Sequence, residues 1–266
     1  MVSDISPSRG TIAGVVARPK FLLTLFVAAG CLAGACSPGA DDEVLVFVAS
    51  SLSQPLTELA THYENETGTR VRVATGSSAA LREQILDGAP AAVFVSASEE
   101  IMDTVADDGL VVGEATPLAA NHLVLAVAVG NPLGVEGVND LARESLRIGA
   151  CTPKAPCGSL AEAVQTSLGW RFSIDGREAN AAALRTKISV GEYDAALLYA
   201  TDARTEAATV EVVDSPELSS SLTIYPVARM VGAGESASAE AFVDWILRPE
   251  NRARLETYGF TNPSER

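Results

Sequence analysis

The strongest constraint on the fold of this chain is the regular alternation of short apolar runs with stretches of helical periodicity. The run Val44–Val48 is rich in β-branched residues and predicts a buried strand, whereas apolar side chains between 52 and 63 recur on one face of a helix. Strands that alternate with helices predict an α/β fold with largely parallel sheets. By the same reasoning we expect further strands at 70–73, 93–95, 123–129, 147–149, 195–199, 210–213 and 222–227, and further helices at 79–86, 99–106, 160–168, 181–190, 239–247 and 251–258.

The first 36 residues differ in character from the rest of the chain. Basic residues at 9, 18 and 20 precede an apolar run at 21–35, which is shorter than the roughly 20 residues that a transmembrane helix needs. A basic start, a short apolar run and small residues at its end are typical of a secretory signal. The run closes with Leu32-Ala-Gly-Ala-Cys36, which resembles a bacterial lipobox.

The lipobox resemblance implies that residues 1–35 are a signal peptide, that Cys36 carries a lipid and that residues 36–43 form a flexible tether. Cys31 is a second candidate for the lipid. Signal cleavage without a lipid and an uncleaved anchor are the alternatives. We therefore expect an exported chain that a lipid holds on the outer face of the bacterial cell membrane.

The charge balance restricts the partners of the chain. Its 34 acidic and 19 basic side chains give a formal net charge of -15, which repels a nucleic-acid backbone. The only histidines in the sequence are His62 and His122, too few for a histidine-built metal site, so we expect no bound metal ion. The sequence contains no G-x-S-x-G, H-E-x-x-H, C-x-x-C or P-loop motif, and we expect neither enzymatic activity nor a cofactor.

Small and hydroxyl residues recur where an expected strand gives way to an expected helix. They form four turns, at Ala49–Leu52, Gly76–Ala79, Cys151–Ser159 and Ala179–Ala181. A helix N-terminus leaves backbone N–H groups unpaired and carries partial positive charge, so such turns are suited to binding an anion. The other interpretation is that each serine only caps its helix, and spacing alone does not show that the four turns meet.

Several longer segments together carry a family resemblance. They are Val46–Leu52, Gly76–Ile85, Gly88–Ser98 and Gly191–Asp202, with the shorter Tyr225–Val227 and Tyr258–Phe260. On these segments, residues 44–263 resemble the periplasmic molybdate-binding proteins of ABC importers. The resemblance implies a two-lobed, type II periplasmic-binding-protein fold, in which each lobe is a mostly parallel sheet flanked by helices and the ligand lies in the cleft between them. Lobe 1 would hold 44–124 and the returning 225–266, and lobe 2 would hold 125–224.

Carried over position by position, the resemblance implies a ligand site of five residues. Ser51 and Ser78 would offer hydroxyl and backbone N–H groups, and Tyr199 would donate its hydroxyl from lobe 2. Cys157, where the family usually has Ala, and Ala181, where Val is common, would each offer a backbone N–H. Groups that only donate suit molybdate, because this dianion carries no proton at neutral pH. For Tyr199 alone, a structural place in the core is an equal alternative.

Cys151 and Cys157 flank two prolines and have five residues between them. In an oxidising compartment we expect them to form a disulfide that closes the third turn and fixes the N–H of Cys157. Two reduced core cysteines are the alternative.

The resulting hypothesis is a monomeric solute-binding lipoprotein, not an enzyme, that captures molybdate, and also tungstate, and delivers it to the membrane permease of an ABC transporter. A binding protein for another tetrahedral oxyanion, such as sulfate, is the alternative within transport. A sensory or adhesive lipoprotein on the same fold is the alternative outside transport.

Overall fold

The computed structural model describes residues 43–170 and 172–263. Residues 40–266 belong to one compact unit. The expected signal peptide and both candidate lipidation sites, Cys31 and Cys36, lie outside the described residues. Within the described ranges, no helix combines the length and the apolar character needed to cross a membrane.

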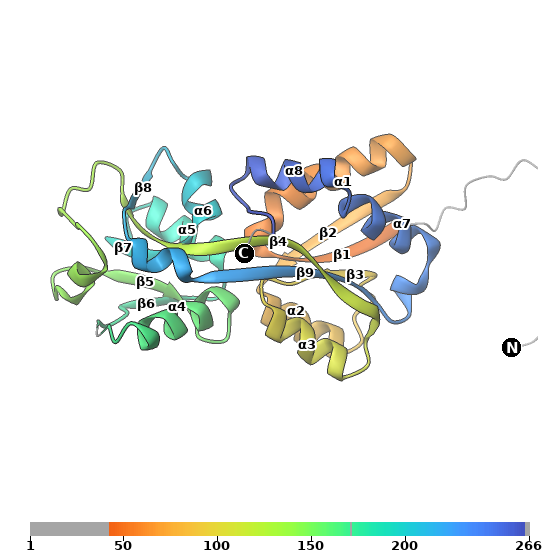
Figure 1. Cartoon of the computed structure of the whole chain (residues 1–266), viewed down its shortest axis with the longest axis horizontal. Coiled ribbons are helices and arrows are strands. Elements are labelled where there is room, and N and C mark those ends of the chain that lie inside the picture. Colours follow the sequence, from red (N-terminus) through yellow and green to blue (C-terminus); the bar gives the residue numbers. More distant parts are fainter. Residues whose placement is uncertain (1–42, 171, 264–266) are drawn as a thin grey trace, which may run out of the picture. The chain divides into compact units, whose positions relative to one another are not determined.

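The described strands pair into one continuous sheet (Figure 1). They are β1 (Glu43–Ala49), β2 (Arg70–Gly76), β3 (Val93–Val95), β4 (Val111–Ala128), β5 (Ile148–Cys151), β6 (Gly176–Glu178), β7 (Ala195–Tyr199), β8 (Val210–Val213) and β9 (Leu222–Met230). Their order is β2-β1-β3-β9-β4-β7-β5-β6, and β8 also pairs with β4. Every residue of β3 and β7 is buried, which explains why these strands appear in the sequence as continuous apolar runs.

Strands β4 and β9 join the two halves of this sheet. β4 pairs with β9 from Val111 to His122 and with β7 from Leu123 onward. The pairs β1–β2, β1–β3, β5–β6 and β5–β7 are parallel, as expected. β4 and β9 are antiparallel to every strand that they pair with among the described residues. The remaining strands of each half run in one direction, so the expectation of mostly parallel sheets is confirmed, with one antiparallel strand in each half.

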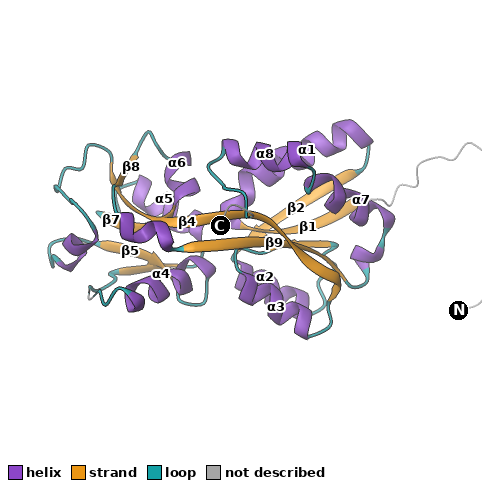
Figure 2. Cartoon of the chain, in the orientation of Figure 1, coloured by secondary structure: helices purple, strands orange, loops and turns teal. Residues whose placement is uncertain are grey.

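Helices flank the strands on both sides (Figure 2). The α-helices are α1 (Ser53–Thr67), α2 (Ser78–Leu86), α3 (Glu99–Asp107), α4 (Pro156–Ser167), α5 (Ala181–Ser189), α6 (Ala200–Thr205), α7 (Ala237–Ile246) and α8 (Pro249–Thr257), and the 3-10 helices are η1 (Ser50–Leu52), η2 (Val138–Ala142), η3 (Pro216–Ser220) and η4 (Ala233–Glu235). Local sequence sets several ends. The side chains of Ser98 and Ser236 accept a backbone N–H from the first turns of α3 and α7, and Gly68 ends α1 at a positive φ of 77°.

Three clusters of buried apolar side chains hold these layers together. One draws on residues 123–218, and its centre includes Leu125, Leu184 and Leu197. The other two draw on 44–119 together with 225–260. Each fully buried leucine or phenylalanine contributes about 1.5–3 kcal/mol, so both halves of the sheet have a substantial core. The exact lobe boundaries given by the sequence resemblance stay a prediction.

Most expected elements are present with small shifts at their ends, and β3, β7 and β8 have the predicted bounds. β4 begins 12 residues before the expected start at Leu123, because Pro117 interrupts the apolar pattern and lies at a register irregularity. α4 begins at Pro156 rather than at Leu160, since proline fits the first position of a helix. β6 and α6 are not predicted by the sequence, because β6 (Gly-Arg-Glu) has no apolar run and the six residues of α6 are too few to show a helical period.

Candidate functional site

The structure places all five residues of the expected site on the wall of one small cavity: Ser51, Ser78, Cys157, Ala181 and Tyr199. The rest of the wall is formed by Ala49, Ser50, Gly76, Ser77, Ala97, Ala155, Pro156 and Asn180. The space between these lining atoms is about 190 Å³, open solvent included. All four turns that the sequence marked therefore meet at one point, which their spacing alone did not show.

Each turn reaches the cavity as the start of a helix. η1 leads into α1, and α2, α4 and α5 begin at residues of the cavity wall. At α5, the side chain of Asn180 accepts the N–H of Ala183 at 2.9 Å. Ala181 is the first residue of this helix, so its N–H has no acceptor inside the helix. The four helix starts bring unpaired N–H groups and partial positive charge to the same cavity.

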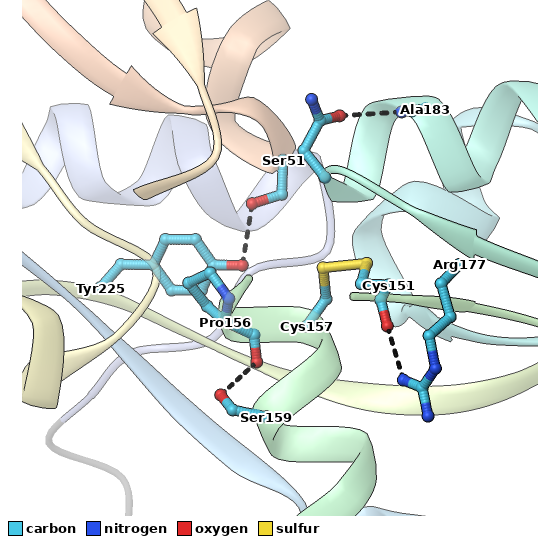
Figure 3. The surroundings of a disulfide bond; sticks show 9 residues. Ser51, Cys151, Pro156, Cys157, Ser159, Arg177, Ala183 and Tyr225 are labelled. Carbon is cyan, nitrogen blue, oxygen red and sulfur yellow. Dashed lines mark hydrogen bonds between the residues drawn. A yellow bond between two sulfur atoms is a disulfide. The ribbon is translucent and has the colours of Figure 1, made fainter. Parts of the chain in front are cut away.

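The start of α4 is fixed by its covalent and steric surroundings. The expected disulfide between Cys151 and Cys157 is present (Figure 3). Pro156 has no N–H, so the first free N–H of the helix belongs to Cys157. A Cβ atom at Gly158 would lie 1.9 Å from the carbonyl oxygen of Thr152, so only glycine allows the helix to approach this loop so closely. The disulfide and the close approach of Gly158 to Thr152 together hold the N–H of Cys157 at the cavity wall.

Ser78 is oriented by a backbone donor. Its side chain is buried, and its Oγ accepts the N–H of Ala97 at 2.9 Å. In this bond Ala97 is the donor, so the single hydrogen of the Ser78 hydroxyl takes no part in it. The hydrogen of Ser78 is therefore free to be donated into the cavity.

Ser51 has a different partner. Its Oγ lies 3.0 Å from the hydroxyl of Tyr225, which comes from β9 and is fully buried. Figure 3 shows this bond beside the disulfide at the start of α4. Tyr225 does not line the cavity, and it reaches the site through its hydrogen bond with Ser51 and through its ring contact with Tyr199.

Tyr199 ends β7 with its side chain in the cavity wall. It is 1% exposed, and its hydroxyl has no hydrogen-bond partner among the described residues. Burial, together with nearby Tyr225 and Asp202, raises the pKa of Tyr199 well above its ordinary value, so the hydroxyl keeps its proton. A buried hydroxyl without a partner costs free energy, which indicates a donor kept for something that enters the cavity.

No charged side chain lines the cavity, although the whole chain has a net charge of -15. A buried carboxylate, that of Asp202, lies in the first turn of α6, which directly follows Tyr199, and it is paired with Arg185 at 3.2 Å. Burial raises the pKa of Asp202 to about 7, and Arg185 opposes this shift. Among the described residues, no group of His, Cys, Asp or Glu side chains is arranged to hold a metal ion. The cavity thus offers hydrogen-bond donors and helix ends, not formal charges.

A larger cleft lies next to the cavity. It shares Ser77 and Ala155 with the cavity wall, encloses about 1370 Å³ including open solvent, and carries the basic side chains of Arg82 and Lys154. Arg82 is paired with Glu83 on the same helix. This cleft is larger than the cavity and is lined by charged side chains, both basic and acidic.

Two buried polar residues near the site, Tyr225 and Asn121, could not be recognised as such from the sequence. Both lie in strands, where a single polar side chain in an apolar run gives no local signal of its partner. Tyr225 belongs to a segment that resembles the family, and Asn121 belongs to none of these segments.

The chain has relatives of known class. Residues 44–261 match the family of bacterial extracellular solute-binding proteins. The molybdate-binding protein ModA of Mycobacterium bovis is 31% identical over 247 residues, which cover 91% of this chain and 95% of that protein.

Solved structures share the fold. The periplasmic molybdate-binding protein of Azotobacter vinelandii is similar at a TM-score of 0.70 and 23% identity, covering 83% of this chain and 99% of that one. The sulfate-binding protein SubI of Mycobacterium tuberculosis is similar at a TM-score of 0.72 and 15% identity, covering 84% and 88%. The fold is therefore that of the type II periplasmic binding proteins. With the family match over most of its length, this chain belongs to the bacterial extracellular solute-binding proteins, in the group that includes the ModA proteins.

Proposed function

We propose that this protein captures a tetrahedral oxyanion that carries no proton, with molybdate as the first candidate and tungstate as the second. Molybdate and tungstate share charge and nearly share size. Their oxygens only accept hydrogen bonds, and the cavity wall offers hydroxyl and backbone donors. A carboxylate in the wall would repel such a dianion, and none is present there.

One observation carries this proposal. Four helix starts and the unpartnered, buried hydroxyl of Tyr199 converge on one cavity without charged side chains. An anion in this cavity would pair the hydroxyl and would meet the positive ends of the helices, so its binding removes a cost of the empty site. A role of Tyr199 only in the core does not account for its unpaired hydroxyl.

The choice of molybdate is supported by the 31% identity to a molybdate-binding protein over 91% of this chain. Sulfate is the second candidate, because the sulfate-binding protein SubI shares the fold. Sulfate is also a proton-free tetrahedral dianion, but it is smaller, so the fit of the anion to the cavity distinguishes the two.

We further propose that the bound anion is delivered to the permease of an ABC transporter by a monomer held on the outside of the cell membrane. The lipobox-like sequence before Cys36 supports the lipid anchor. Cys36→Ser should move the protein from the membrane fraction to the soluble fraction, whereas Cys31→Ser should leave it in the membrane fraction. The opposite result would assign the lipid to Cys31.

Titration calorimetry tests the ligand. The described unit, expressed without residues 1–35, should bind molybdate and tungstate at submicromolar concentration and should bind neither sulfate nor phosphate in that range. Equal binding of sulfate would replace the molybdate assignment by a broader oxyanion receptor. Binding of phosphate alone would contradict a site made only of donors.

A further inference from the structure

Three buried polar side chains from different elements form a chain of hydrogen bonds that ends at the cavity. Asn121 lies on β4, Tyr225 on β9 and Ser51 on η1, and their exposed fractions are 0%, 0% and 7%. The Nδ2 of Asn121 lies 3.4 Å from the Tyr225 hydroxyl, which lies 3.0 Å from the Oγ of Ser51. Only Ser51 touches the cavity.

The direction of this chain follows from its first member. The Oδ1 of Asn121 accepts the N–H of His122 at 2.9 Å, which identifies the other end of the amide as the nitrogen. That nitrogen can only donate, and it donates to Thr201 Oγ1 at 2.8 Å and to the Tyr225 hydroxyl. The oxygen of Tyr225 is therefore an acceptor toward Asn121. The distance between Tyr225 and Ser51 allows either hydroxyl to donate. We take Tyr225 as the donor, because its buried hydrogen would otherwise have no acceptor among its hydrogen-bond partners in the described residues.

Tyr225 keeps that hydrogen at any ordinary pH, because burial raises the pKa of its hydroxyl. Ser51 Oγ then accepts from Tyr225, and the single hydrogen of Ser51 points to the remaining open direction, which is the cavity. Ser78 is in the same state for a different reason, because its Oγ accepts the N–H of Ala97. Each serine thus directs its hydrogen to the cavity, while one lone pair of its oxygen is already occupied by a hydrogen bond.

We propose that Asn121 and Tyr225 are positioning residues that fix Ser51 as a donor toward the ligand, so that the site selects oxyanions without a proton. This inference rests on the proposed function, since it concerns how the same cavity chooses its ligand. A serine free to rotate would also accept a hydrogen bond, and would then accommodate the proton of phosphate. The relay opposes this rotation at Ser51, because a Ser51 that donated to Tyr225 would leave the buried hydrogen of Tyr225 without an acceptor. At Ser78 the N–H of Ala97 already occupies one of the two lone pairs.

Tyr225→Phe tests the selection. It removes only the hydroxyl and keeps the ring, whose centroid lies 5.4 Å from that of Phe260 and 6.1 Å from that of Tyr199. We expect molybdate to bind about tenfold more weakly, as for the loss of one hydrogen bond. Phosphate, measured by displacement of molybdate, should bind no more weakly than before, because Ser51 can now accept its proton.

A matched control is Tyr193→Phe. Tyr193 is also buried and also donates its hydroxyl, to Glu178 at 2.6 Å, but it is not among the residues that line the cavity. This control should leave the affinities for both anions unchanged. An equal loss of molybdate and phosphate affinity in Tyr225→Phe would assign Tyr225 a merely structural role and overturn the proposal, and unchanged molybdate affinity would overturn it as well.

A second experiment needs no ligand. In the proton NMR spectrum of the empty protein, the Tyr225 hydroxyl should give a slowly exchanging resonance that is absent in Tyr225→Phe and shifted in Ser51→Ala. A resonance that Ser51→Ala does not shift would show that the hydroxyl does not point to Ser51, and would overturn the relay. If the unmodified protein fails to bind molybdate, the proposed function fails, while this experiment still decides the relay.

Discussion

The two sides of the cavity supply hydrogen-bond donors by different means. On one side, Ser51 and Ser78 use hydroxyls whose oxygens are already held by Tyr225 and by the Ala97 N–H. On the other side, Cys157 and Ala181 offer backbone N–H groups, and Tyr199 offers a hydroxyl that no described residue holds. The first side depends on side-chain identity and serves both fold and ligand. On the proposed function, the second side would tolerate different side chains at its two backbone donors, and its one hydroxyl would serve only the ligand.

The largest combined effect is expected on the first side, for Ser78→Ala. It removes a donor to the anion, at about 1.5–3 kcal/mol of binding free energy, and leaves the buried N–H of Ala97 unpaired, at about 1–3 kcal/mol of unfolding free energy. Calorimetry and denaturant unfolding measure the two losses. A variant that loses affinity but keeps full stability would show that Ala97 does not need Ser78.

Tyr199→Phe should also weaken binding, but it should not lower stability. Its hydroxyl is desolvated and unpaired in the empty protein, so the variant should lose about 1.5–3 kcal/mol of binding free energy and no unfolding free energy. The same two measurements decide this. A loss of stability equal to that of Ser78→Ala would erase the difference between the two sides.

Ala181→Pro isolates a backbone donor. Asn180 has the extended φ of -161° and ψ of 171° that a residue before proline prefers, and proline is accepted at the first position of α5. The variant should bind the anion more weakly by about 1.5 kcal/mol, since only one N–H is lost. Ala181→Val keeps the N–H and should bind as the unmodified protein does. Equal weakening by both would mean that space, not the N–H, is what this position supplies.

Reduction of the disulfide should have a smaller effect on affinity. Without the disulfide, the backbone at Cys157 has to become ordered when the anion binds. This ordering costs about 1 kcal/mol of binding free energy, roughly the conformational entropy of one residue. Calorimetry with and without reductant measures it, and alkylation of both Cys151 and Cys157 before reduction would show that the bond is absent. Cys151→Ser with Cys157→Ser should match the reduced protein.

The smallest expected effect is a pH dependence of stability. The pKa of Asp202 is raised to about 7, chiefly by burial, so the folded state binds a proton that the unfolded state has lost above about pH 4. Stability therefore falls as the pH rises from about 4 to about 7. Asp202→Asn should become more stable, relative to the unmodified protein, between pH 5 and pH 8.

Asp194 is the matched control for this measurement. The hydrogen bonds from the Arg147 side chain lower the pKa of Asp194, so its contribution to stability is present near neutral pH and is lost in acid. Asp194→Asn should therefore be destabilising at pH 8, opposite in sign to Asp202→Asn. The same sign in both variants would contradict the assigned environments.

Much of the fold could be predicted from the sequence because buried strands such as β3 and β7 are unbroken apolar runs. The first half of β4 escaped prediction because Pro117 and the register shifts beside it disturb the period. β4 and β9 run antiparallel to the strands beside them. This direction depends on which strands pair in the folded sheet, and no single segment of the sequence encodes that pairing.

The site divides in the same way. Ser51, Ser78 and the turn at Cys157 follow strand ends, where polar residues are conspicuous, so the sequence could single them out. Their convergence, the free hydroxyl of Tyr199 and the support of Ser51 by Tyr225 arise only when distant strands pack together, and only the structure displays them.

The most direct test is a crystal structure of the protein with molybdate or tungstate, located by the anomalous scattering of the metal. The anion should lie in the small cavity, with its oxygens within hydrogen-bond distance of the hydroxyls of Ser51, Ser78 and Tyr199 and of the backbone nitrogens of Cys157 and Ala181. An anion found instead in the larger cleft beside Arg82 and Lys154 would contradict the account.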